Sequence, residues 1–172
     1  FGSSGVISSN VNQMTRAGKF LGGKAAYALG TIKGLVSYRN QRVRLRVDDT
    51  YEEELVVNTV AIANGRYFGG SMKIAPVAYL DDGLFDIVII GDMSLVDFLK
   101  NNRKLYRGNH LDYPGFSMLR GRKVVASVVG STDNVLVETD GETPGRLPVT
   151  YEIMPKALKL LAPWGRSEAL EY

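Results

Sequence analysis

The sequence of 172 residues contains no cysteine and a single histidine, His110. Without cysteine the chain cannot form disulfides, thiolate nucleophiles or zinc sites with cysteine ligands, which fits a reducing compartment. One histidine cannot form a multi-histidine metal site, and we expect His110 to be an ordinary loop residue. These absences exclude several common kinds of catalytic and structural site.

Long apolar runs are also absent. A segment that crosses a membrane needs about 18 uninterrupted apolar residues, and Lys19, Lys24 and Lys33 break the most apolar region of the chain. The start of the chain lacks a methionine and has no basic segment followed by an apolar run, the pattern of a secretory signal. We therefore expect a fragment of a longer protein, whose contact with membranes is peripheral.

Acidic residues are missing from residues 1–46, which carry eight positive charges. Because the net charge of the whole chain is +3, the remaining residues carry −5. Such asymmetry indicates an anionic neighbour for the first quarter of the chain, such as nucleotide phosphate, an anionic bilayer or an acidic partner domain. Simple solvation of these charges is an equally good explanation.

Hydrophobic residues form 45% of the chain, which is typical of a globular protein. A chain of this length buries roughly two-thirds of the surface that its unfolded form exposes. We expect one domain over residues 1–163, followed by a tail over residues 164–172.

Apolar residues recur with helical spacing between Val11 and Val36. We predict two helices in this region, meeting at Gly22–Gly23. Gly30 and Gly34 would allow one of them to pack closely, and we expect the contact to be with a sheet.

Strand-like patterns dominate the rest of the chain. From Arg42 to Val47 the chain alternates strictly, so that three arginines share one strand face, where they either contact phosphates or are solvated. One helix interrupts the strands over residues 94–107, because Ser94 and Asp97 have the arrangement of a capping box. The other predicted strands are residues 55–63, 84–90, 123–129, 135–138, 148–153 and 157–161. These patterns indicate a mainly β (α+β) fold: an antiparallel β-sandwich with a helical segment near the N-terminus and one inserted helix.

Asp81, Asp82 and Gly83 place two carboxylates at a turn, where glycine lets the chain fold sharply. An oxygen-rich turn suits a hard cation such as magnesium or calcium, although most turns of this sequence are plain surface turns. Upstream, the glycine-rich segment from Asn64 to Met72 lacks the Lys-Ser/Thr that follows a phosphate-binding loop. We interpret this segment as a tight strand connection.

Asp140 and Glu142, separated by Gly141, follow a predicted strand and precede Thr143. We expect both carboxylates to lie on a loop that leaves a sheet, where they can point into a cleft. In phosphoryl transfer, carboxylates serve as a base for the acceptor hydroxyl or bind the magnesium that offsets phosphate charge. The tripeptide by itself is commonplace.

Residues 64–86 and 140–142, in this order and spacing, resemble the second domain of the diacylglycerol kinase family, which includes bacterial lipid kinases and, more distantly, sphingosine and ceramide kinases. The match extends from Phe1 to Pro163, with Ser71 standing where the family has a third glycine. That family binds ATP mainly through an earlier domain carrying a Gly-Gly-Asp-Gly-Thr loop, and this sequence contains no such segment. The resemblance therefore implies the C-terminal half of an enzyme, inactive when alone.

The resemblance also implies roles for particular residues. It assigns a structural magnesium or calcium ion to the Asp82 side chain and the main-chain carbonyls of Tyr79 and Leu84. It makes Asp140 a candidate catalytic base or acceptor-orienting residue, with Glu142 supporting it through magnesium or water. It identifies no residue of this chain that binds a cofactor.

The implied function is ATP-dependent phosphorylation of a lipid hydroxyl, with diacylglycerol as the substrate, phosphatidic acid as the product and Mg-ATP as the co-substrate. The implied partners are the lipid, the missing N-terminal nucleotide-binding domain and a membrane surface, in a cytoplasmic, peripheral location. A homodimer is left open. The alternative is a non-catalytic lipid-binding or regulatory module of the same fold. We expect no nucleic-acid partner, because few aromatic residues interleave with the arginines.

Overall fold

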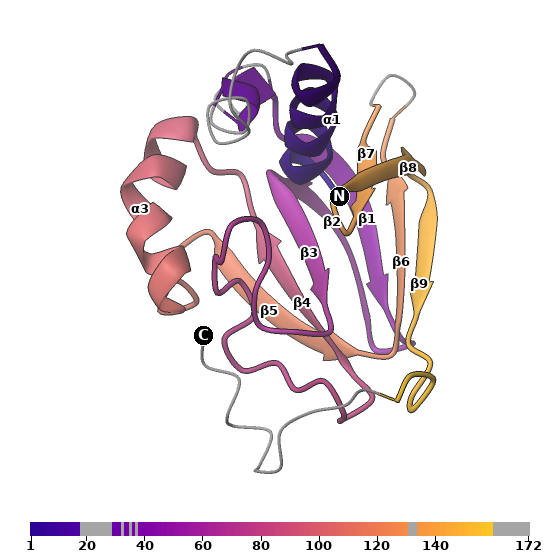
Figure 1. Ribbon diagram of the computed structural model, residues 1–172. Helices are drawn as coiled ribbons and strands as arrows, with labels where there is room; N and C mark the ends of the chain where they lie inside the picture. Colours follow the sequence, from indigo (N-terminus) through magenta and orange to yellow (C-terminus); the bar gives the residue numbers. More distant parts are fainter. Residues whose placement is uncertain (18–28, 32, 35, 37, 131–133, 160–172) are drawn as a thin grey trace.

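The computed structural model describes residues 1–17, 29–31, 33, 34, 36, 38–130 and 134–159. Helices α1 and α3 flank a set of antiparallel strands (Figure 1). Among the described residues, the helices with assigned bounds are α1 (Ser3–Ala17) and α3 (Leu95–Arg107), and the strands are β1 (Gln41–Val47), β2 (Tyr51–Val57), β3 (Thr59–Ala63), β4 (Phe85–Ile90), β5 (Phe116–Gly121), β6 (Lys123–Val128), β7 (Leu136–Thr139), β8 (Glu142–Arg146) and β9 (Val149–Glu152).

The strands of the described residues form two sheets and a hairpin. One sheet has the order β2-β1-β6-β9 and the other has the order β3-β4-β5, while β7 pairs with β8. Every strand pair is antiparallel. Side chains of both sheets meet in one apolar cluster, so the predicted mainly β (α+β) sandwich is confirmed.

The larger core lies between the two sheets. Val43, Leu45 and Val47 of β1 are buried in it, and Ile87 and Ile89 of β4 meet them from the other sheet. The residues that alternate with the three buried side chains of β1 are exposed. Strict alternation of this kind fixes the register, because a slip of one residue would exchange the apolar and the charged face.

A second core lies on the outer face of the β3-β4-β5 sheet. Val88 and Ile90 of β4 point into it and meet Ile74 and Leu105, the latter from α3. Both faces of β4 are therefore buried, which explains its continuous apolar sequence. The segment that follows the glycine-rich motif covers this outer face with the buried side chains of Ile74, Ala75 and Ala78.

Residues 55–63, predicted as a single strand, belong to two strands in different sheets, the end of β2 and all of β3. The division falls at the buried Asn58, whose backbone N–H donates to the Ile90 carbonyl at 2.8 Å. The side-chain Oδ1 of Asn58 accepts a hydrogen bond from the Ser3 hydroxyl at 2.8 Å. These two bonds hold the chain at the point where it passes from one sheet to the other, and the prediction was wrong because it had no signal for them.

Other boundaries also differ from the predictions. The first helix, α1, begins at Ser3 rather than near Val11, and strands β5 and β8 were not predicted. Residues 157–159 of the predicted last strand are not in a strand. Residues 160 and 161, the tail over residues 164–172 and the predicted helix junction at Gly22–Gly23 lie outside the described residues.

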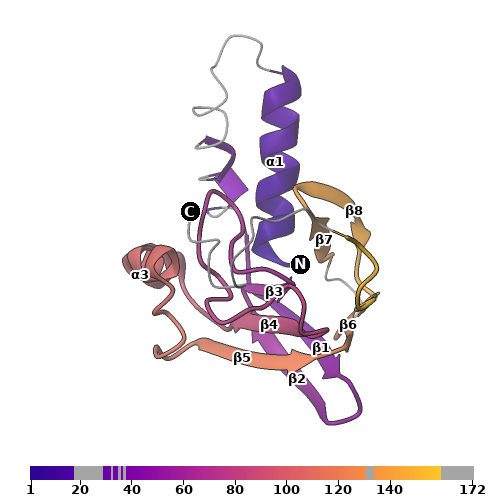
Figure 2. The ribbon, with the colours of Figure 1, turned by 60° about the horizontal axis from the view of Figure 1, so that its bottom comes forward.

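Gly30 and Gly34 pack against α1 rather than against a sheet. A Cβ atom at Gly30 would lie 2.7 Å from Cγ2 of Val11, and one at Gly34 would lie 2.8 Å from Cγ1 of Ile7. The described residues around both glycines are helical and lie beside α1 (Figure 2). Glycine thus lets two helical segments approach closely. In the described part of the chain, no helix is both long and apolar enough to cross a membrane.

The helix predicted over residues 94–107 is confirmed as α3. The Ser94 hydroxyl accepts a hydrogen bond from the Asp97 backbone N–H at 3.2 Å, and Gly108 ends the helix with a φ of 73°. His110 follows in a loop and is fully buried, where its Nε2–H donates to the Ile74 carbonyl at 3.0 Å. This histidine therefore joins the end of α3 to the segment that covers the second core.

Candidate functional site

The predicted catalytic residues lie at the turn between β7 and β8. Asp140 and Gly141 have φ angles of 48° and 87°, and the flanking residues Thr139 and Glu142 pair across the hairpin. Two consecutive residues with positive φ define the type I′ turn, for which Asp-Gly is a preferred sequence. Asp140 thus lies on a connection that leaves a sheet, as expected, whereas the expectation was wrong for Glu142, which begins β8 directly after the two-residue turn.

Two side chains fix the turn from either side. The Asn12 side chain of α1 donates to the Gly141 carbonyl at 3.0 Å, and the Glu138 carboxylate accepts from the Gly141 N–H at 2.7 Å. Both Asp140 and Glu142 are exposed. Within the described residues, neither of these two carboxylates has a hydrogen-bond or ion-pair partner. The hairpin, held by Asn12 and Glu138, thus presents two exposed carboxylates without a partner among the described residues.

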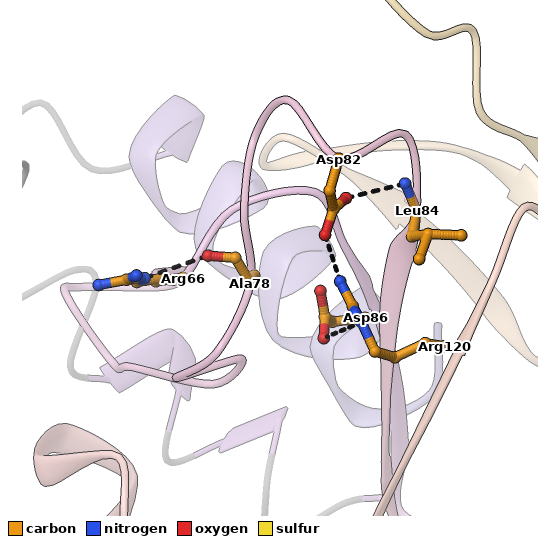
Figure 3. A network of polar contacts seen from close by, with 6 residues as sticks. All are labelled: Arg66, Ala78, Asp82, Leu84, Asp86 and Arg120. Carbon is orange, nitrogen blue, oxygen red and sulfur yellow. Dashed lines mark hydrogen bonds and ion pairs between the residues drawn. The ribbon is translucent and has the colours of Figure 1, made fainter. Parts of the chain in front are cut away.

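The predicted cation ligand Asp82 lies at a turn just before β4. Its Oδ1 accepts a hydrogen bond from the Leu84 backbone N–H at 2.9 Å, across Gly83, which has a φ of 71°. Its Oδ2 pairs with the guanidinium group of Arg120 from β5 (Figure 3). Sequence patterns did not identify Arg120 as part of this site.

Arg120 also reaches a second carboxylate. Its Nε lies 3.3 Å from Oδ1 of Asp86, the residue that faces it across the β4–β5 pair. Asp86 is 0% exposed, and within the described part of the chain its carboxylate has the ion pair with Arg120 and no hydrogen bond. Burial raises the pKa of Asp86, and the nearby Arg120 opposes this rise. The site therefore contains two carboxylates and one shared guanidinium.

The residues around Asp82 fit a hard divalent cation in their chemistry. The predicted donors are all oxygens, namely the Asp82 carboxylate and the carbonyls of Tyr79 and Leu84. Among the described residues there is no cluster of three or more metal-ligating side chains, so main-chain carbonyls would have to complete the coordination. The Arg120 guanidinium now occupies one oxygen of Asp82, and a cation would have to displace it.

The glycine-rich motif forms a tight connection, as its sequence predicted. Phe68 and Met72 exchange two backbone hydrogen bonds, each of 3.0 Å. The three residues between them, Gly69, Gly70 and Ser71, have φ angles of 44°, 75° and 71°. Ser71 thus occupies a left-handed conformation at the position where the resemblance would place a glycine.

Arg66 joins this motif to the stretch that leads to Asp82. Its Nε donates to the Ala78 carbonyl at 3.1 Å (Figure 3). Its guanidinium carbon lies 5.4 Å from the centre of the Tyr79 ring. The motif and the predicted cation site therefore form one connected surface. Within the described residues, no hydrogen bond or ion pair links this surface to the β7–β8 hairpin.

The arginine face of β1 is largely compensated by β2. Arg44 lies opposite Glu54 and Arg46 lies opposite Glu52 in the strand register. The Arg44 guanidinium forms an ion pair of 2.6 Å with Glu54, at an exposed position. These contacts favour a solvated strand face over a phosphate site.

The comparisons with known proteins agree with this architecture. Residues 3–162 match the family described as the YegS C-terminal NAD kinase beta sandwich-like domain. The chain belongs to this family. It is 26% identical to a diacylglycerol kinase of Bacillus subtilis over 87% of this chain and 48% of the relative. It is 27% identical to a diacylglycerol kinase of Mycobacterium tuberculosis over 90% of this chain and 49% of the relative.

Solved structures show the same fold. A crystal structure described as a putative diacylglycerol kinase of Bacillus anthracis superimposes with a TM-score of 0.59 at 22% identity, over 78% of this chain and 45% of that one. The chain spans about half the length of the relatives that it matches. The expected resemblance to the C-terminal domain of bacterial lipid kinases is thereby confirmed.

Proposed function

We propose that this chain is the acceptor-side domain of an ATP-dependent kinase that phosphorylates the hydroxyl group of diacylglycerol. The observation that carries the proposal is the hairpin held by Asn12 and Glu138, whose two exposed carboxylates, Asp140 and Glu142, have no partner among the described residues, in a domain of this family. The relatives bearing the diacylglycerol kinase name are about twice as long as this chain. In our proposal the missing half holds ATP, and the chain alone gives no turnover.

In this reaction the lipid hydroxyl oxygen bonds to the γ-phosphorus of ATP, the bond from that phosphorus to the leaving ADP oxygen breaks, and the hydroxyl proton is released. Asp140 takes this proton or orients the hydroxyl, and its free carboxylate is suited to either task. Glu142 acts beside it through water or through magnesium. Magnesium bound with ATP supplies charge compensation on the phosphates.

Asp82 has a structural role in the proposal. It holds magnesium or calcium together with the Tyr79 and Leu84 carbonyls, and thereby fixes the segment that lies on the outer face of the β3-β4-β5 sheet. Removal of the cation would then lower stability rather than alter the chemistry directly.

Peripheral contact with an anionic bilayer completes the proposal. Lys100, Arg103 and Arg107 are exposed on α3, and Val96 and Tyr106 are exposed apolar residues of the same helix. Basic and apolar side chains on one exposed helix suit the surface of an anionic membrane. Replacing Lys100 and Arg103 by glutamate should weaken sedimentation with vesicles that contain phosphatidylserine, and unchanged sedimentation would remove α3 from the membrane contact.

The decisive experiment is Asp140→Asn in the full-length protein, assayed for transfer of labelled phosphate from ATP to diacylglycerol in mixed micelles. Asparagine also favours the first position of a type I′ turn, so this change removes the charge and keeps the hairpin. We expect a loss of turnover of at least about a hundredfold if Asp140 is the base, with an unchanged melting temperature. Asp112→Asn, at another exposed loop, is the matched control. Full turnover by Asp140→Asn would reject the assignment.

A second candidate function is a non-catalytic lipid-binding module. One observation favours it, since the Asp-Gly sequence at residues 140 and 141 is fully explained by the needs of the type I′ turn. The same assay separates the two, because a binding module would retain lipid binding and show no turnover in the wild-type full-length protein.

A further inference from the structure

Asp82 already has a cationic partner within the protein. The Arg120 guanidinium lies between two carboxylates, with Oδ2 of Asp82 on one side and Oδ1 of Asp86 on the other (Figure 3). The two acids differ in their surroundings, because Asp82 lies on a partly exposed turn and Asp86 is fully buried. The single guanidinium group of Arg120 is therefore shared by the carboxylates of Asp82 and Asp86.

The buried acid, Asp86, has its ion pair with Arg120 but no hydrogen bond within the described residues. Asp82 also accepts a hydrogen bond from the Leu84 N–H, whereas neither oxygen of Asp86 makes a hydrogen bond within the described residues. A buried charge without hydrogen bonds is costly, and a closer approach of the guanidinium group would reduce that cost. Arg120 therefore has a favourable alternative position, paired with Asp86 alone.

We propose that Arg120 competes with the divalent cation for Asp82, and that Asp86 sets the outcome by receiving Arg120 when the cation binds. This inference rests on the cation site proposed above. In the cation-free state Arg120 holds the Asp82 turn to β5. In the cation-bound state the cation holds the turn, and Arg120 stays with Asp86. Cation affinity is then lower than the oxygen donors alone would give, and two residues that do not touch the cation control it.

Substitutions at the two residues should act in opposite directions. Arg120→Gln removes the competitor and leaves two carboxylates, so Mg²⁺ and Ca²⁺ should bind at least about tenfold more tightly, as expected from the loss of one nearby positive charge. Asp86→Asn removes the alternative partner, confines Arg120 to Asp82 and should weaken binding about tenfold by the same reasoning. Asparagine has nearly the shape of aspartate, so this variant should fold.

The experiment measures cation affinity by titration calorimetry, and melting temperature with MgCl₂ or CaCl₂ against NaCl of equal ionic strength. Arg122→Gln is the matched control, because Arg122 is an exposed arginine close to Arg120 in the chain, and among the described residues the ion pairs of both carboxylates are with Arg120 and not with Arg122. Asp82→Asn should abolish the response to both cations.

The outcomes separate the inference from the cation site. Opposite shifts of Arg120→Gln and Asp86→Asn, with Arg122→Gln unchanged, support the competition. A response that Asp82→Asn abolishes but that neither Arg120→Gln nor Asp86→Asn alters overturns the competition and leaves the cation site standing. Absence of any response in the wild type and in Arg120→Gln overturns both. If Arg120→Gln does not fold, an unchanged affinity in Asp86→Asn is sufficient to reject the inference.

Discussion

Gly5 of α1 lies directly against Leu136 of β7. A Cβ atom at position 5 would stand 2.7 Å from the Leu136 carbonyl oxygen, which belongs to the backbone and cannot move away as a flexible side chain could. This contact, together with the hydrogen bond from Asn12 to Gly141, places α1 against the hairpin that carries the candidate catalytic residues. The position of the hairpin thus depends on a glycine far away in the sequence.

Gly5→Ala should separate α1 from the hairpin. The added methyl group would overlap backbone atoms, and overpacking of this kind costs about 1–3 kcal/mol. Gly145→Ala is the matched control, because a Cβ at that position would meet nothing within 4 Å. Urea denaturation should show a lower midpoint for Gly5→Ala and a nearly unchanged one for Gly145→Ala. Equal midpoints would show that α1 and β7 can accommodate a methyl group between Gly5 and Leu136.

Asp48 should stabilise the bend between β5 and β6. Its carboxylate accepts hydrogen bonds from the backbone N–H groups of Arg122 at 3.0 Å and Lys123 at 2.8 Å, and its own φ is 48°. Asp48→Gly keeps the backbone conformation and removes the acceptor, so it should lower the free energy of unfolding by about 1 kcal/mol. Asp48→Asn keeps one acceptor oxygen and should lose less. Denaturation curves in which both variants match the wild type would exclude this role.

The free energy of unfolding should decrease as the pH is lowered through the range in which the buried His110 becomes protonated. Burial lowers the pKa of His110 below its usual value of 6.5, although the Ile74 and Lys104 carbonyls oppose this effect. The unfolded state therefore binds the proton at a higher pH than the folded state does. The stabilising contribution is complete above pH 6.5 and is lost as the pH falls through the lower folded pKa, by up to about 1.4 kcal/mol per pH unit.

His110→Gln tests this pH dependence, since glutamine has no titrating group and retains an amide donor. The difference in the free energy of unfolding between pH 7.5 and pH 5 should be smaller in the variant than in the wild type. Carboxylates titrate in both proteins and cancel in the comparison. An identical pH dependence would mean that His110 does not contribute to it.

Much of the sheet structure follows from local sequence. The alternation of β1 fixed its inward face, because apolar and charged residues cannot exchange sides without burying charge. The division at Asn58 could not be predicted, because it depends on hydrogen bonds to Ile90 and Ser3, which are distant in the sequence. Strand β5 was not predicted because its buried and exposed residues do not alternate regularly. Its strand conformation depends on pairing with β4, which is distant in the sequence.

In the candidate sites, too, some features follow from local sequence and others depend on residues that are distant in the sequence. Asp-Gly at residues 140 and 141 is a strong hairpin signal, and the turn could have been predicted from it. The Arg120 contact with Asp82 could not, because it spans 38 residues and requires the β4–β5 register, which places Arg120 beside Asp86. The residues of a turn can be predicted from its local sequence motif. An ion-pair partner on another strand can be identified only when the pairing of the strands is known.

The protein should be less stable with serine at position 71 than with glycine there. Its φ of 71° is left-handed, a conformation that costs residues other than glycine about 1 kcal/mol. Ser71→Gly relieves this cost but makes the unfolded chain more flexible, so we expect a gain in stability of less than about 1 kcal/mol. Ser71→Val should instead lose more than about 1 kcal/mol, because a β-branched side chain is poorly accommodated there.

Ser117→Val is the control for Ser71→Val, because it makes the same chemical change at an exposed position of β5, where valine suits the strand. Differential scanning calorimetry of the variants should rank the melting temperatures as Ser71→Gly above the wild type and Ser71→Val below it, with Ser117→Val close to the wild type. If Ser71→Val melts with the wild type, residue 71 is not held in a left-handed conformation. The serine would then be a tolerated departure at a position where backbone shape is unconstrained.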